Sequence, residues 1–463
     1  MDLTIYNGTI LPMTGKEVRA VSVDKGWIRA VKKVPARREI DLEGKVLIPG
    51  FIDCHTHLIG MGLKLLNVDL SSVTCAEKAV ALLEERAENL EPDEWVLGYG
   101  WDESFWSERR YLTAKELSHI EHPVYAVRVD GHIAVLNTAA QKKLNVKKEY
   151  LYEDELFSIQ SLLSQNMEEA FTKALEVCHQ QGVTSIHDNP GNIQNFTLYQ
   201  QMPQKKIRIY VNLPVSVLDS VHTVGLHSGF GNQWLRFGGI KIFTDGSIGA
   251  KTAATSFPYT DTKTHGVLIY DDAQLQDILY RAAPNQTAIH AIGDRAIEQV
   301  LTLSRPGERN RIEHAELLRD DQIPRVKSLG LVLSMQPNFL QWSHPGGLYD
   351  QRFGTGKDNR FHIMQKTGIP LVFGSDCMPF SPLFGIQQVV NAPYESQRLS
   401  VMDAFSIYTK NGAYASFEEN IKGTIEEGKL ADFVVLSGDP REKDISTLSV
   451  DMTIVGGDVI YTA

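Results

Sequence analysis

Cysteine is scarce in this chain of 463 residues. The four cysteines are Cys54, Cys75, Cys178 and Cys377, and no two of them form a Cys-x-x-Cys pair. A disulfide scaffold or a zinc site made of thiolates would need more cysteine at closer spacing. We therefore expect reduced thiols and exclude both of these classes.

Long apolar runs and an excess of positive charge are also missing. No stretch approaches the ~18 consecutive apolar residues of a transmembrane helix. The N-terminal MDLTIYNGTI has no basic segment before an apolar run, as a secretory signal would. Lys and Arg number 46 against 57 Asp and Glu, a net charge of −11 that argues against a nucleic-acid groove. We expect a cytoplasmic protein that binds neither membranes nor nucleic acid.

The composition is that of a globular protein, with 43% hydrophobic and 22% charged residues. Short apolar runs separated by Asn-Gly, Lys-Gly and Glu-Gly turns fill residues 1–50, which is typical of a β-meander. Similar strand-rich segments occupy residues 418–463. We expect the two ends to pair into one small β-sandwich, whose exposed edges would permit a homodimer.

Between the two ends, strand candidates alternate with helical stretches. Eight such strands are predicted at 47–58, 182–188, 206–213, 238–246, 287–292, 311–317, 331–337 and 369–376. This rhythm is typical of an α/β protein with a (β/α)₈ TIM-like barrel, here predicted over 51–417. The residues between the first two strands, about 60–180, contain strand candidates of their own. They predict an inserted α/β subdomain.

Ionisable residues stand at the ends of the predicted barrel strands. His55 and His57 are two residues apart, so they would point to the same face of the first strand. Alone, this pair would equally fit one solvated and one packed imidazole. Lone polar residues at or near the mouths of later strands are Lys241, His290, His314 and Asp376. Burying such groups costs several kcal/mol each unless they are paired or ligated, and a shared metal would offset these costs together.

The chemistry of these groups assigns them different roles. Imidazoles and a carboxylate are ligands for Zn²⁺ or a similar divalent ion, whereas an ammonium has no lone pair to offer. Lys241 is therefore either a salt-bridge donor or an N6-carboxylysine whose carbamate bridges two metals. In the second case, one ion would be held by His55, His57 and Asp376, and the other by His290 and His314.

The ordered set of motifs resembles the amidohydrolase superfamily, and within it amidohydrolase family 3, the YtcJ-like metal-dependent hydrolases. The supporting segments are PGFIDCHTHL, GWDESFW, VDGHIAVLN, GVTSIHD, IKIFTDGSIGAKTA, IHAIGDRAI, RIEHAE, FGSDCMP and GTIEEGKLADFVVL. The resemblance implies a distorted barrel with a terminal β-sandwich, a metal-activated hydroxide and hydrolysis of a C–N bond. Because the superfamily includes enzymes with a single metal, the number of ions stays open.

The same reasoning assigns roles around the reaction. Asp376 is expected to act as general base and then as general acid toward the leaving nitrogen. Trp101, Asp130 and His132 lie at strand ends of the insertion, which the resemblance places over the pocket. His132 would either donate to the substrate carbonyl or oxyanion, or be an ordinary turn histidine.

The leading hypothesis is a metal-dependent hydrolase that cleaves an amide, N-acyl or N-formyl bond of a small molecule. A deaminase or a cyclic-amide hydrolase on the same metal centre is the alternative. A non-catalytic scaffold of the same fold would be expected to lose ligands, whereas all six positions are filled here. Apolar side chains in the loops after strands seven and eight would line the pocket or pack the insertion onto the barrel: Phe339, Leu340, Trp342, Met378, Phe380 and Phe384.

Overall fold

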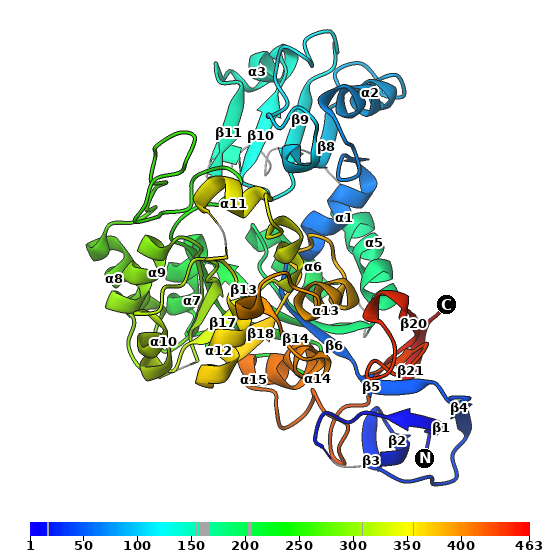
Figure 1. The fold of residues 1–463 in the computed structure, drawn as a ribbon. Helices are drawn as coiled ribbons and strands as arrows, with labels where there is room; N and C mark the ends of the chain where they lie inside the picture. Colours follow the sequence, from blue (N-terminus) through cyan, green and yellow to red (C-terminus); the bar gives the residue numbers. More distant parts are fainter. Residues whose placement is uncertain (16–17, 154, 157–165, 202–205, 308, 355) are drawn as a thin grey trace.

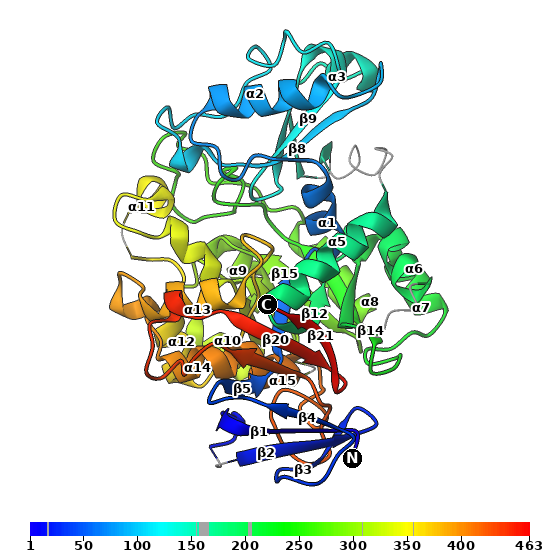
Figure 2. The same ribbon diagram turned by 90° about the vertical axis from the view of Figure 1, so that its right-hand side faces the viewer.

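The computed structural model describes residues 1–15, 18–153, 155–156, 166–201, 206–307, 309–354 and 356–463. A sheet made from both chain ends, a central barrel and a smaller sheet lie one after another along the molecule (Figure 1). A quarter turn shows the same order of the three parts (Figure 2). Among the helices of the described ranges, none is long and apolar enough to cross a membrane.

An eight-stranded parallel sheet forms the barrel. In pairing order, its strands are β6 (Phe51–Thr56), β12 (Val183–Asp188), β13 (Arg208–Pro214), β14 (Leu235–Phe243), β15 (Gln286–Ala291), β16 (Arg311–His314), β17 (Val332–Met335) and β18 (Leu371–Phe373). Each strand overlaps one of the segments predicted from the sequence, so the (β/α)₈ fold class is confirmed. The helices that alternate with or follow these strands are α6 (Ile193–Gln201), α7 (Leu218–Thr223), α8 (Asp272–Ala282), α9 (Asp294–Leu303), α10 (Ile323–Leu329), α11 (Leu348–Phe353), α12 (Phe361–Thr367), α13 (Pro382–Val390), α14 (Val401–Ser406) and α15 (Gly412–Ala415).

Individual hydrogen bonds between the last and first strands nearly close the barrel. The backbone N–H of Asp376 donates to the carbonyl of His55 at 2.9 Å, and that of Ser375 donates to Oδ1 of Asp53 at 2.9 Å. Gly374 permits this approach, because a β-carbon there would lie 2.3 Å from the backbone nitrogen of His55. Closure therefore places Asp376 directly beside His55.

Alternation along the strands decides which side chains face the barrel interior. Ile240 and Ile242 of β14 belong to the apolar core shared with the surrounding helices, so Lys241 between them points the other way. Ile289 of β15 joins the same core, and its neighbour His290 points inward. The two-residue period that buries the apolar side chains thus also directs ionisable ones toward a common centre.

Both chain ends contribute to the terminal sheet. Its strands are β1 (Leu3–Ile10), β2 (Val18–Asp24), β3 (Trp27–Ala30), β4 (Arg38–Asp41), β5 (Val46–Pro49), β19 (Phe433–Leu436), β20 (Val450–Val455) and β21 (Asp458–Thr462). Strand β5 pairs antiparallel with β19, which joins the two ends as predicted. Phe433 and Val435 pack into the core of this sheet, whereas Val434 and Leu436 pack into the core of the barrel. The sheet is thereby held against the barrel.

A buried ion pair also joins the terminal sheet to the barrel. Arg208 donates through Nε to Oδ2 of Asp432 at 2.6 Å and through Nη2 to Oδ1 at 2.9 Å. The two side chains are 2% and 6% exposed. Asp432→Ala would leave a buried guanidinium without its carboxylate, so we expect the free energy of unfolding to fall by about 3–5 kcal/mol.

Urea denaturation followed by circular dichroism measures this change. Asp458→Ala is the control, because Asp458 pairs with Arg38 at 3.4 Å while its side chain is 80% exposed. That substitution should change the free energy of unfolding by less than about 1 kcal/mol. An equally small effect of Asp432→Ala would contradict a stabilising role for the buried pair.

The third part is a five-stranded sheet inserted between β6 and β12. Its strands are β7 (Val68–Asp69), β8 (Val96–Trp101), β9 (Val124–Arg128), β10 (Ile133–Leu136) and β11 (Tyr150–Tyr152), accompanied by α2 (Ala76–Ala87) and α3 (Thr138–Leu144). Helices α1 (Leu58–Leu66) and α5 (Met167–Gln180) lie side by side between this sheet and the barrel (Figures 1 and 2). The sheet falls within the predicted insertion of about 60–180, of which residues 154 and 157–165 lie outside the described residues.

Candidate metal centre

Three histidines and an aspartate from the predicted ligand set meet at the mouth of the barrel. His55, His314 and Asp376 offer ligand atoms that all lie within 4.8 Å of one another. His57 Nε2 lies 3.3 Å from Oδ1 of Asp376. Imidazole nitrogens and a carboxylate oxygen converging in this way form a donor set that suits Zn²⁺ and similar divalent ions.

The two other predicted residues border this group. The ring centroid of His290 lies 4.6 Å from that of His314, and Lys241 Nζ lies 3.5 Å from Nε2 of His55. Within the described part of the chain, no carboxylate lies within ion-pair distance of Lys241. Burial lowers the pKa of Lys241 to about 8, because it disfavours the charged amine. The structure thus brings together all six residues that the sequence singled out.

Glu313 orients His55 from behind. Nδ1 of His55 lies 2.5 Å from Oε2 of Glu313, so the ring directs Nε2 toward the centre. Arg311 pairs with Glu313 at 2.7 Å, and all three side chains are fully buried. Burial alone would raise the pKa of Glu313, but Arg311 and Lys241 outweigh it and lower that pKa. A carboxylate on the far nitrogen of a histidine fixes both its tautomer and its orientation.

The other three rings are held in the same manner, each through one nitrogen. The contacts are His57 Nδ1 to the Asn189 carbonyl at 2.8 Å, His314 Nδ1 to the side-chain oxygen of Gln336 at 2.7 Å, and His290 Nε2 to the Gly246 carbonyl at 3.1 Å. Burial, together with neighbouring positive charge, holds the pKa values of His55, His290 and His314 well below the usual range. Neutral imidazoles with one nitrogen left free are the form that binds metal.

Two of these side chains sit on unusual backbone. His314 has φ of +73° and Asp376 has φ of +51°, in the left-handed region that non-glycine residues rarely occupy. Such a conformation persists only where the surrounding structure enforces it, and it is common at functional sites. For Asp376, the enforcing contact is the backbone hydrogen bond to His55 that closes the barrel.

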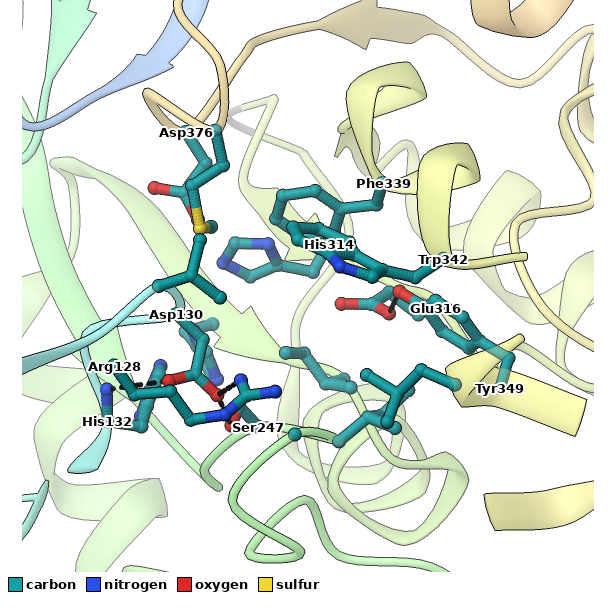
Figure 3. Close-up of a pocket in the computed structure, with 17 residues that line it drawn as sticks. Arg128, Asp130, His132, Ser247, His314, Glu316, Phe339, Trp342, Tyr349 and Asp376 are labelled. Carbon is teal, nitrogen blue, oxygen red and sulfur yellow. Dashed lines mark hydrogen bonds and ion pairs between the residues drawn. The ribbon is translucent and has the colours of Figure 1, made fainter. Parts of the chain in front are cut away.

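A pocket opens beside the cluster, and Figure 3 shows its lining. His290, His314 and Asp376 form one part of its wall. Polar residues of the inserted sheet and apolar residues of the barrel loops complete it: Arg128, Asp130, His132, Ile248, Ile292, Phe339, Trp342, Leu348 and Met378. These three candidate ligands therefore face the pocket. Of the six apolar loop residues named from the sequence, Phe339, Trp342 and Met378 line it.

A model of the amidohydrolase family matches residues 38–461. The chain belongs to the amidohydrolase family. It is 29% identical to the Bacillus subtilis protein YtcJ over 96% of each chain. It is 25% identical to the N-substituted formamide deformylase of Arthrobacter pascens over 99% of this chain and 98% of that one. A solved structure, an uncharacterized metal-dependent hydrolase from Pyrococcus horikoshii, matches with a TM-score of 0.78 and 27% identity over 96% of this chain and 99% of that chain.

Membership confirms the family resemblance carried by the sequence motifs. It also supports the coarser part of the functional hypothesis, a hydrolase that depends on a divalent metal. The identity of the metal, the state of Lys241 and the bond that is cleaved belong to the proposals below.

In this amidohydrolase, His132 reaches the pocket from the inserted sheet. Its Nδ1 lies 2.7 Å from Oε2 of Glu153, and its ring centroid lies 5.4 Å from that of His290. Burial alone would lower the pKa of His132, but Glu153 and Asp130 outweigh it and raise the pKa to about 9. A protonated imidazole beside the cluster is a hydrogen-bond donor available to a substrate oxygen.

The two other predicted substrate residues lie in different places. Asp130 lines the pocket, where it accepts from Ser247 Oγ at 2.5 Å and pairs with Arg128 Nη1 at 2.9 Å. Trp101 is fully buried in the apolar core of the inserted sheet, and its Nε1 donates to the Ala126 carbonyl at 3.0 Å. The structure does not bring Trp101 to the pocket, so its role in substrate binding stays a prediction.

Two acids of the amidohydrolase site lie outside the set predicted from the sequence. Glu313 is a second charged residue inside a buried strand, two positions from Arg311 and on the same face, and this is the signal that points to it. Glu316, in the loop after that strand, lines the pocket and is 3% exposed. Burial raises the pKa of Glu316 to about 8, and nearby acids add to this effect. Only its place in the motif RIEHAE could have drawn attention to it.

Proposed function

We propose that this amidohydrolase uses a divalent metal, Zn²⁺ by its donor set, to hydrolyse the C–N bond of a small amide, N-acyl or N-formyl compound. The observation that carries the proposal is the meeting of His55, His314 and Asp376 within 4.8 Å. The latter two also line the pocket. The name of the Arthrobacter pascens relative, a deformylase of N-substituted formamides, supports the N-formyl class.

The donor set fits either one ion or two. In the two-ion arrangement, one ion would be held by His55, His57 and Asp376, and the other by His290 and His314. Lys241 would join them as an N6-carboxylysine, because a carbamate has oxygens that can bridge two metals. Supporting this, Lys241 Nζ lies 3.5 Å from His55 Nε2, and the residue is 2% exposed. Among the described residues, no carboxylate oxygen lies within ion-pair distance of its amine.

When bound, such an ion would lower the pKa of a water molecule and polarise the substrate carbonyl. Asp376 lies in the pocket wall, with Oδ1 3.7 Å from His55 Nε2. There it would accept the proton of the attacking water and pass it to the leaving nitrogen, as general base and then acid. His132, held by Glu153, would donate to the carbonyl oxygen.

A panel of formamides, acetamides, carbamates, cyclic amides and aminopurines tests this proposal. Protein stripped with a chelator should lose hydrolysis of at least one formamide or acetamide and regain it with Zn²⁺. The products distinguish the alternatives when the amides are N-substituted, since their hydrolysis releases an acid and a substituted amine whereas a deaminase releases ammonia. Protein that purifies without stoichiometric metal and cleaves none of these compounds would overturn the proposal.

Glu313→Gln is expected to weaken the binding of Zn²⁺ by about 10–100-fold. The amide keeps the shape of the side chain but no longer fixes His55 with a negative charge. Competition with a zinc-binding dye measures the affinity, and a thermal melt checks that the variant is folded. Glu298→Gln, on the outer helix α9 with its side chain 37% exposed, is the matched control. Equal affinities for the two variants would remove Glu313 from this role.

A further inference from the structure

Glu316 is a pocket carboxylate to which the proposed reaction assigns no role. Three carboxylates line the pocket, Asp130, Glu316 and Asp376. Asp376 is assigned to the metal and the proton, and Asp130 is neutralised by Arg128 at 2.9 Å. Arg128 is itself fully engaged, since Glu103 also pairs with it at 2.9 Å. Glu316 is left without an assigned partner.

Only one of the two carboxylate oxygens of Glu316 accepts a hydrogen bond among the described residues. The hydroxyl of Tyr349 donates to Oε2 of Glu316. In the described ranges, no donor reaches Oε1 and no Lys, Arg or His lies within ion-pair distance of the carboxylate. The side chain is nevertheless only 3% exposed. Burying a carboxylate that lacks a charged partner is costly, and this cost is what raises the pKa of Glu316. A cationic donor on a bound molecule would offset the cost and favour the charged form.

Aromatic rings stand around this carboxylate. Figure 3 shows Glu316 between the rings of Trp342 and Tyr349, with one oxygen toward Tyr349 and the other toward the part of the pocket that His314 lines. Phe339 and Trp342 are 5.3 Å apart between ring centroids and meet edge to face. Trp342 is held in place because its Nε1 donates to Asp102 at 2.7 Å.

Three acids act on Glu316 from elsewhere in the pocket region. Asp358, Asp245 and Asp376 add to the effect of burial in raising the pKa of its carboxyl group. Aromatic faces attract cations, and a carboxylate gives an ammonium a directed hydrogen bond. An acid and a set of rings together therefore favour one kind of ligand at this end of the pocket, a cationic amine.

We propose that Glu316, Trp342 and Tyr349 bind a cationic amino group of the substrate, at the end of the substrate away from the bond that is cleaved. The proposal rests on the proposed function and narrows its substrate class to amines that are N-formylated or N-acylated at one end and carry a free ammonium at the other. Glu316 is thus a specificity-determining residue. Because Glu316 follows His314, the last residue of β16, by only two positions, the two ends of the substrate would be separated by a short linker.

Paired substrates test the proposal. N-formyl diamines with linkers of increasing length are compared with N-formyl alkylamines in which a methyl group replaces the ammonium. We expect the wild-type enzyme to prefer the best diamine by roughly 100-fold in kcat/KM, because a site built for a polar group strongly rejects an analogue that lacks it. Glu316→Gln should remove most of this preference through KM, because kcat/KM should fall much more for the diamine than for the alkylamine.

Two further variants serve as controls. Asp320→Asn removes a carboxylate from the same loop at a side chain that is 83% exposed, and should leave the preference intact. Tyr349→Phe removes the donor to Oε2 but keeps the negative charge, so most of the preference should survive. Should Glu316→Gln fail to fold, Glu316→Asp withdraws the carboxylate from the rings and should reduce the preference in the same direction.

A binding measurement separates this inference from the proposed function. Calorimetry with a free alkylamine and the zinc-loaded protein needs no turnover, and Glu316→Gln should weaken that binding by roughly tenfold or more. If formamides are not cleaved but the amine binds through Glu316, the proposed function fails and the amine site stands. If formamides are cleaved with no preference for the ammonium, or Glu316→Gln affects both substrates equally, the amine site is overturned and the proposed function stands.

Discussion

Asp376→Asn is expected to lower kcat by roughly 10²–10⁴-fold while the protein stays folded. The amide keeps the size of the side chain and leaves the backbone hydrogen bond to His55, at 2.9 Å, in place. It cannot accept a proton from water or return one to a leaving nitrogen, and it is a poorer ligand. Steady-state kinetics on a substrate that the panel identifies measure the loss, with metal content determined on the same sample.

Asp376→Asn could lose turnover either through lost proton transfer or through lost metal. A variant that retains metal but loses turnover assigns Asp376 to the proton, whereas a variant that loses both assigns it chiefly to the metal. Asp350→Asn, a carboxylate in α11 that accepts from the Gly346 N–H at 2.9 Å, is the control for removing an acid near the pocket. Near-normal kcat in a metal-replete Asp376→Asn enzyme would discard the role as general base and acid.

Lys241→Ala is expected to lower kcat by roughly 10²–10³-fold if the lysine is carboxylated, because a charged group facing the reacting centre is lost. A short carboxylate such as propionate should then restore part of the activity by occupying the vacated space. A lysine that acts as a plain cation predicts the opposite, rescue by an alkylamine.

Lys422→Ala provides the matched control for Lys241→Ala. Lys422 is also buried, at 4% exposure, but it is paired with Glu418 at 2.6 Å. Its removal should lower stability and should not respond to propionate. Loss of metal from Lys241→Ala together with rescue by carboxylate would establish the carbamate, whereas rescue by an alkylamine alone would exclude it.

Much of the fold could be predicted from local pattern. In each barrel strand, apolar side chains that pack against the surrounding helices alternate with side chains that point into the barrel. Ile240, Lys241 and Ile242 illustrate this pattern. The pairing of the chain ends was also predictable, since both ends show turn-punctuated strands and neither forms a sheet with the middle. The ligand set followed from chemistry, because ionisable side chains at the mouths of buried strands need a common partner.

Contacts between segments far apart in the chain could not be predicted from the sequence. Trp101 stands at a strand end, and only the structure shows that its indole donates to the carbonyl of Ala126 within the core of the inserted sheet. Glu313 carries no sign in the sequence that it meets His55, a residue more than 250 positions earlier. Glu316 becomes notable only when Trp342 and Tyr349 are seen beside it.

The sequence by itself determined the family, the barrel and the six residues that gather at its mouth. Periodicity and the placement of ionisable groups are local properties, and they can be read along the chain. Three features were decided by the tertiary structure alone. They are the nitrogen of each imidazole that faces the centre, the contact of Glu313 with His55, and the position of Glu316 in the pocket wall without a charged partner in ion-pair distance among the described residues. These depend on distances between side chains from different strands and loops, which are set when the barrel closes and the inserted sheet is packed over it.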